Sequence, residues 1–154
     1  MLEAGARAPD FTLKETSGVP WTLREALARG PVLLTIYKIS CPVCQGTLPF
    51  LDRITKSESL QVVAISQDDE SGTAQFREKF GGSMTTLLDP EEDGYRVSNA
   101  FAITHVPSIF LIEPDGLISL AVSGFSKSDL ESIARRAAQP IFREGEKVKQ
   151  WVPG

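Results

Sequence analysis

Two near-continuous apolar segments dominate the hydrophobic pattern of the chain. They span residues 31–37 and 61–66, and each has the length of a β-strand. Strands that are covered on both faces show such runs instead of strict alternation, because neither face meets water. The pattern therefore predicts two central strands buried between layers of helices.

Shorter segments with strand character surround these two. An alternating stretch over 8–13 predicts a short strand at the edge of a sheet, and 85–89 predicts a weaker strand. Segments 108–112 and 117–123 are separated by the sequence Glu-Pro-Asp-Gly, which favours a type I turn because proline stands second and glycine fourth. We expect these two segments to form a hairpin.

Apolar residues at helical spacing lie between the strands. They predict helices over 21–28, from Pro42 through Ile54, around Phe76 and Phe80 up to Gly81-Gly82, over 95–102 and over 129–138. Thr22 and Ser126 are the expected N-caps of the first and last helix, because their hydroxyls accept hydrogen bonds from free N–H groups.

The order of elements predicts an α/β fold with a central mixed β-sheet flanked by helices and a short N-terminal strand extension. No linker, repeat or low-complexity segment interrupts the sequence, so we expect a single domain over 1–154 with a polar C-terminal tail at 139–154. A length of 154 residues and a hydrophobic content of 42% suit one soluble domain.

The net charge and the lengths of the apolar runs argue against some classes of function. Sixteen Lys and Arg against twenty Asp and Glu give a net charge of −4, which argues against a nucleic-acid partner. No apolar run approaches the ~20 residues of a membrane span. The first residues lack the basic and apolar regions of a signal peptide, so we expect a cytoplasmic protein; an exported protein without its leader would have the same sequence.

The chemistry-bearing feature is a pair of cysteines, Cys41 and Cys44, which are the chain's two cysteines. Cys41 follows a predicted buried strand and immediately precedes a predicted helix. The free N–H groups and the positive dipole of a helix start stabilise a thiolate, which is the reactive form of cysteine. Cys44 is one turn further on, within reach of Cys41, so the spacing favours a redox dithiol.

Other interpretations of the pair are weaker. One alternative is that both cysteines are inert core residues at the start of an apolar helix. A structural zinc site needs four ligands, and His105 is the only further soft ligand, so we expect no metal and no other cofactor.

Three motifs together resemble the redoxin branch of the thioredoxin superfamily: Ala-Pro-Asp-Phe-Thr-Leu at 8–13, Cys-Pro-Val-Cys at 41–44 with Pro49 behind it, and Val106-Pro107 ahead of a strand. That branch includes the TlpA-like thiol-disulfide oxidoreductases and, more distantly, the peroxiredoxins. The resemblance covers residues 5–138. It implies a thioredoxin-like fold and thiol-disulfide exchange with protein partners.

The resemblance also implies roles for individual residues. Cys41 would attack the substrate disulfide and Cys44 would resolve the mixed disulfide. The substrate-binding residues would be Pro42, Val43, Val106 and Pro107, with Pro107 preceded by a cis peptide bond. The implied partners are protein dithiols or disulfides and an upstream electron donor, and the expected state is a monomer.

The chain departs from its relatives where they carry acids. Thioredoxins place a buried aspartate at the position of Thr35, and many TlpA-like proteins place a glutamate at the position of Thr47. Thr47 and His105 are therefore candidates for a proton relay to the resolving thiol, although His105 has an equally simple interpretation as a rim residue. We expect the resolving step to be slow at neutral pH.

Two further functions use the same cysteines. A peroxiredoxin-like peroxidase would use Cys41 as its peroxidatic residue, but Lys38 and Leu34 stand where peroxiredoxins carry a hydroxyl residue and a proline. A copper-binding thioredoxin-like module would use Cys41, Cys44 and His105, because thiolates select Cu(I). However, copper chaperones of this fold have three residues between their two cysteines, one more than this chain has.

Overall fold

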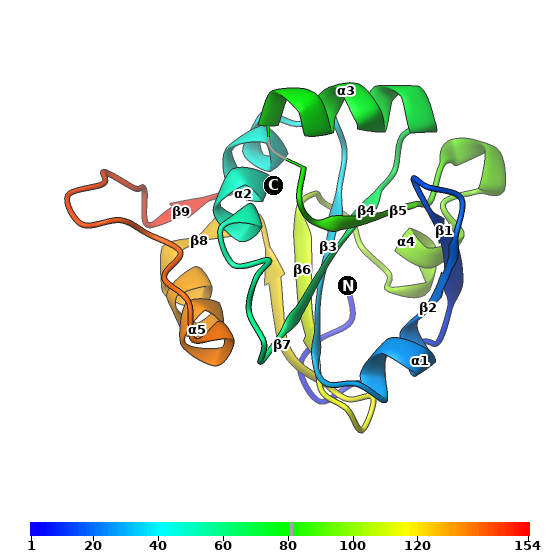
Figure 1. The fold of residues 1–154 in the computed structure, drawn as a ribbon, viewed down its shortest axis with the longest axis horizontal. Helices are drawn as coiled ribbons and strands as arrows, with labels where there is room; N and C mark the ends of the chain where they lie inside the picture. The colour runs from blue at the N-terminus through cyan, green and yellow to red at the C-terminus, as the bar shows by residue number, and fades with distance from the viewer. Residues whose placement is uncertain (81) are drawn as a thin grey trace.

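A seven-stranded mixed sheet with helices on both faces forms the centre of the computed structural model, which describes residues 1–80 and 82–154 (Figure 1). The strand order is β2-β1-β5-β4-β3-β6-β7. The strands are β1 (Thr12–Glu15), β2 (Pro20–Thr22), β3 (Val32–Tyr37), β4 (Gln61–Ser66), β5 (Thr85–Leu88), β6 (Ser108–Ile112) and β7 (Ile118–Ser123). The helices are α1 (Leu23–Leu27), α2 (Pro42–Asp52), α3 (Glu70–Phe80), α4 (Arg96–Ala100) and α5 (Lys127–Ala137), with a 3-10 turn at Glu91–Asp93.

Strand β3 is the axis of the fold. All six of its residues are buried, and it pairs in parallel with β4 and antiparallel with β6. Leu33 and Tyr37 face a core layer shared with α2, α3 and α5, whereas Leu34 and Ile36 face a layer shared with α1 and α4. Both faces are thus covered, and the predicted α/β architecture with a central mixed sheet is confirmed.

The N-terminal part differs from the prediction in its boundaries. The first strand begins at Thr12, and Pro20–Thr22 forms a second strand antiparallel to it. Thr22 is the N-cap residue of α1, but its hydroxyl bonds to the Thr12 hydroxyl at 2.9 Å. The capping acceptor is instead Asp10, whose carboxylate accepts the N–H of Arg24 at 3.0 Å.

The hairpin and the last helix agree with the sequence patterns. Strands β6 and β7 pair antiparallel, and the Ser126 hydroxyl accepts the N–H of Asp129 at 3.4 Å at the start of α5. Helix α3 ends at Phe80; Gly81, the first glycine of its expected stop signal, lies outside the described residues. Within the described ranges, no helix has the length and apolar character needed to cross a bilayer.

Residues 139–154 fold back onto the body of the protein. Ile141 is 1% exposed, and the Phe142 ring packs at 5.1 Å from that of Phe50 in α2. Farther along, β9 (Trp151–Val152) pairs antiparallel with β8 (Phe125–Ser126), the short strand between β7 and α5. In Figure 1 this segment runs beside α5 and returns to α2. These contacts were not expected from the sequence.

Candidate functional site

Cys41 is the N-cap residue of α2, in the loop that follows β3. Its Sγ accepts the backbone N–H of Cys44 at 3.4 Å, so the side chain takes the place of a capping oxygen. Pro42 occupies the first helical turn, where a missing N–H costs nothing. Cys41 is half-buried, so part of this residue is open to solvent.

Cys44 lies one turn further into α2 and is buried in the core layer beneath that helix. Burial is the main cause that raises the pKa of its thiol, because a thiolate loses solvation there. The neighbouring Cys41 thiol and the Asp68 carboxylate raise this pKa further. Both cysteines are free thiols in this structure. The two cysteines therefore differ in how far they are exposed to solvent.

The loop before β6 lies beside Cys41, because β6 pairs with β3 and places Ser108 opposite Ile36. The Val106–Pro107 peptide bond is cis, as the resemblance implies. The Cys41 thiol donates to the carbonyl oxygen of Val106 at 3.5 Å. Pro107 is buried and Val106 is half-buried, so the backbone of Val106 is the part of this loop next to the reactive sulfur.

The two candidate proton relays have other partners. The Thr47 hydroxyl is buried and donates to the carbonyl of Val43 at 2.6 Å, within its own helix. His105 is exposed, and its Nδ1 shares a hydrogen bond of 2.9 Å with the hydroxyl of Thr104. In the described part of the chain, no hydrogen bond joins either side chain to a thiol, and their relay role remains a prediction.

Thr35 holds the place of the thioredoxin aspartate and lies under the site. It is fully buried on β3 between Leu33 and Tyr37, so its side chain points into the same layer as Cys44. Its Oγ1 has no hydrogen-bond partner among the described atoms. A hydroxyl is no base at neutral pH, so Thr35 does not replace the missing acid.

Asp68 is a site residue that the sequence analysis did not single out as functional. Its carboxylate accepts the N–H of Ile39 at 2.8 Å and so holds the loop that leads into Cys41. Strands β3 and β4 are parallel, and the residues after both therefore meet at one edge of the sheet. This rule, applied to the two apolar runs, would have placed Asp68 near the dithiol.

The competing chemistries lack support at this site. Lys38 Nζ donates to the Tyr95 hydroxyl at 3.5 Å, and Leu34 is buried in the opposite core layer, so neither supplies the hydroxyl and proline of a peroxidase. Across residues 1–80 and 82–154, no three His, Cys, Asp or Glu side chains gather closely enough to hold a metal ion.

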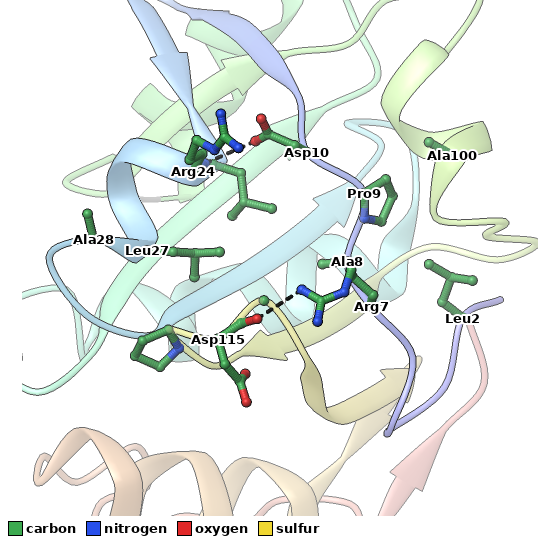
Figure 2. Close-up of a pocket in the computed structure, with 13 residues that line it drawn as sticks. Leu2, Arg7, Ala8, Pro9, Asp10, Arg24, Leu27, Ala28, Ala100 and Asp115 are labelled. Carbon is green, nitrogen blue, oxygen red and sulfur yellow. Dashed lines mark hydrogen bonds between the residues drawn. The ribbon is translucent and has the colours of Figure 1, made fainter.

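A cavity of about 850 Å³ lies away from the dithiol (Figure 2). It is lined in part by residues 114–116, in the turn that follows β6. Because Val32 pairs with Ile112, this turn lies at the start of β3, whereas Cys41 follows its end. The cavity therefore lies at the opposite end of the sheet from the dithiol. Two of the residues that line it, Arg7 and Asp115, are joined by a hydrogen bond of 3.0 Å from the Arg7 guanidinium to the Asp115 carbonyl (Figure 2).

Solved structures of other proteins share the fold of this chain. A putative thiol:disulfide interchange protein DsbE from Chlorobium tepidum superposes with a TM-score of 0.77 at 25% identity, over 90% of this chain and 97% of that one. Peroxidoxin BcpB from Mycobacterium tuberculosis superposes with a TM-score of 0.72 at 22% identity, over 90% and 96% of the two chains, which shows a shared fold alone. With its free cysteine pair beside a cis proline, the chain is of the thiol-disulfide oxidoreductase class, as the sequence predicts.

The family follows from sequence similarity. The chain belongs to the AhpC/TSA family, which it matches over residues 4–121. Thiol-disulfide oxidoreductase ResA of Geobacillus kaustophilus is 26% identical over 135 residues, which cover 84% of this chain and 75% of that protein. Methylamine utilization protein MauD of Methylobacillus flagellatus is 27% identical over 132 residues, which cover 85% of this chain and 62% of that protein.

Proposed function

We propose that this oxidoreductase reduces disulfides in partner proteins, with Cys41 as the attacking thiol. The difference in exposure between the two cysteines carries the proposal. Cys41 is half-buried and therefore accessible to a substrate disulfide, whereas Cys44 is covered by the core. The N–H of Cys44 stabilises negative charge on that sulfur.

The first step is an exchange of one bond for another. The Cys41 thiolate attacks one sulfur of the substrate disulfide, the S–S bond of the substrate breaks, and its other cysteine leaves as a thiolate. Cys41 is now in a mixed disulfide with the substrate. The backbone of Val106 lies beside this bond, and Pro42, Val43 and Pro107 flank it, so these residues are the proposed contacts of the substrate chain.

Cys44 completes the reaction. Its thiol loses a proton and attacks Cys41 Sγ, and the substrate leaves as a second thiolate. The substrate has then gained two electrons, and Cys41 and Cys44 are joined in a disulfide. A reduced dithiol in an upstream donor protein restores the free thiols by the same exchange in reverse. We propose that the protein acts as a monomer in this cycle.

The experiment is single-turnover reduction of a disulfide peptide by the reduced protein. We expect Cys41→Ser to lose the activity and Cys44→Ser to accumulate a mixed disulfide with the peptide, visible by mass spectrometry. Iodoacetamide near neutral pH should label Cys41 first in the wild type. First labelling of Cys44 would reverse the assignment.

A parallel reaction with hydrogen peroxide separates this function from a peroxidase. We expect peroxide to oxidise Cys41 no faster than an ordinary thiolate, because Lys38 is held by Tyr95 and offers no hydroxyl to the peroxide. Stopped-flow rates several orders of magnitude higher would instead favour peroxidase activity.

A further inference from the structure

In the segment from Lys147 to Val152, the two valines face inward and the other residues are exposed. Val148 and Val152 are half-buried and pack against the core, whereas Lys147 and Lys149 are exposed. Trp151 is 61% exposed, which is unusual for an aromatic side chain of this size. One side of the segment thus fits the protein, and the other presents two cations and an indole ring to solvent.

This segment is fixed next to the dithiol. Strand β9 pairs with β8 through Val152 and Phe125, and the N–H of Lys127 donates to the carbonyl of Gln150 at 2.9 Å. Farther back, Arg53, the C-cap residue of α2, makes a two-pronged ion pair with Glu146, with distances of 2.8 and 2.9 Å. The segment is therefore held at both ends.

A groove of about 300 Å³ lies between this segment and α2. Pro42 and Val43, the two residues between the cysteines, form one wall together with Phe50. Val148 and Val152 form the opposite wall. Its volume is at the low end of the roughly 300–1,000 Å³ of ligand sites, which suits one or two side chains of a peptide.

Charge around the groove differs from that of the whole protein. The chain has a net charge of −4, yet the residues that line the groove include Lys147 and Lys149 and no carboxylate. Glu146 is neutralised by Arg53. An acidic segment that approaches Cys41 along this wall therefore meets positive charge.

We propose that the groove and its two lysines select the substrate: a protein segment with a large apolar side chain beside its disulfide cysteine and carboxylates around it. The apolar side chain enters the groove, and the carboxylates pair with Lys147 and Lys149. This assignment rests on the proposed attack of Cys41 on protein disulfides.

The test uses three synthetic disulfide peptides and the reduced protein. One carries leucine next to its cysteine and glutamates around it, the second replaces the glutamates by lysines, and the third replaces the leucine by serine. We expect the first to be reduced roughly three- to tenfold faster than the second, because each exposed ion pair contributes modestly. The difference should shrink in about 0.5 M salt, where charges are screened.

Substitutions test whether Lys147 and Lys149 cause the preference between the peptides. The double variant Lys147→Glu/Lys149→Glu should reverse the preference between the first two peptides. The double variant Lys14→Glu/Lys56→Glu changes the net charge equally at exposed positions outside the groove lining, and should keep it. The third peptide should react at least about threefold more slowly than the first, since it buries less apolar surface.

The outcomes separate this inference from the proposed function. Equal rates with all three peptides, or a preference that survives the reversal of Lys147 and Lys149, would overturn the groove as a selector while leaving disulfide reduction intact. No reduction of any peptide would overturn the proposed function itself.

Discussion

Replacing Thr35 by valine should make the protein more stable. Thr35 is fully buried at the middle of β3, opposite Ala64 and Ile109 in the neighbouring strands, and its Oγ1 has no described partner. Leaving a buried polar group unpaired costs about 1–3 kcal/mol. Valine fills nearly the same space without a hydroxyl and suits a strand, so this cost is removed.

We expect Thr35→Val to raise the free energy of unfolding by about 1–2 kcal/mol, since the fit of the new methyl group is imperfect. For a chain of this size, that corresponds to a rise in Tm of roughly 2–8 °C. Urea unfolding followed by circular dichroism measures the first quantity, and calorimetry measures the second.

Thr35→Ser is the matched control. It keeps the hydroxyl and removes only the methyl group, so we expect a loss of about 1 kcal/mol from the missing apolar contact. If Thr35→Val is instead less stable than the wild type by a similar amount, then the hydroxyl has a partner and the argument from its isolation is refuted.

Four other perturbations test the site and the contacts that support it. Burial raises the pKa of the Cys44 thiol, so the rate at which Cys44 resolves a mixed disulfide should rise roughly tenfold per pH unit between about pH 6 and 9. Thr47→Glu should raise this resolving rate near pH 7 about tenfold, because the glutamate supplies a base. Both rates are measured by rapid quench. The Arg53 guanidinium lowers the pKa of Glu146 to about 2, so this pair stabilises the fold above the ordinary carboxyl pKa of ~4.3, and its contribution should disappear as pH falls towards 2. Acid unfolding of Arg53→Gln should lack that part of the transition. Ser126→Ala should cost about 1 kcal/mol in urea unfolding, because α5 loses its cap.

Each of these has an opposing result. Resolution that is flat with pH would mean that another group deprotonates Cys44, and His105 would be the first residue to replace. An acid transition that is unchanged in Arg53→Gln would show that the ion pair with Glu146 adds nothing in solution. A stable Ser126→Ala variant would mean that α5 is held by its packing alone.

The sequence predicts best those parts of the fold that are set by burial over several residues. The two apolar runs became β3 and β4, and the cysteine pair fell at the start of α2. The N-terminal hairpin was predicted less well, because β2 has three residues and Trp21 also fits the first turn of a helix. Thr22 lies at the N-cap position as expected, but its hydroxyl makes a hydrogen bond with the hydroxyl of Thr12 on the paired strand and does not cap the helix.

The site shows the same division. Cys41, Cys44 and the loop before Pro107 follow from local motifs, which a single sequence displays. The contact of 139–154 with α2 was not predicted, because it depends on contacts between distant residues and on a strand of two residues. Periodicity cannot detect an element that short, although the valines at 148 and 152 were spaced to face one side.

Gly124 joins the cis-proline loop to the C-terminal segment. Its N–H donates to the carbonyl of Pro107 at 2.8 Å, and its φ of +79° suits glycine. A Cβ at this position would collide with the carbonyl oxygen of Val152 and would lie 2.8 Å from the nitrogen of Gly154. A side chain at this position would therefore meet the C-terminal segment, so we expect homologues that keep this segment to keep the glycine as well.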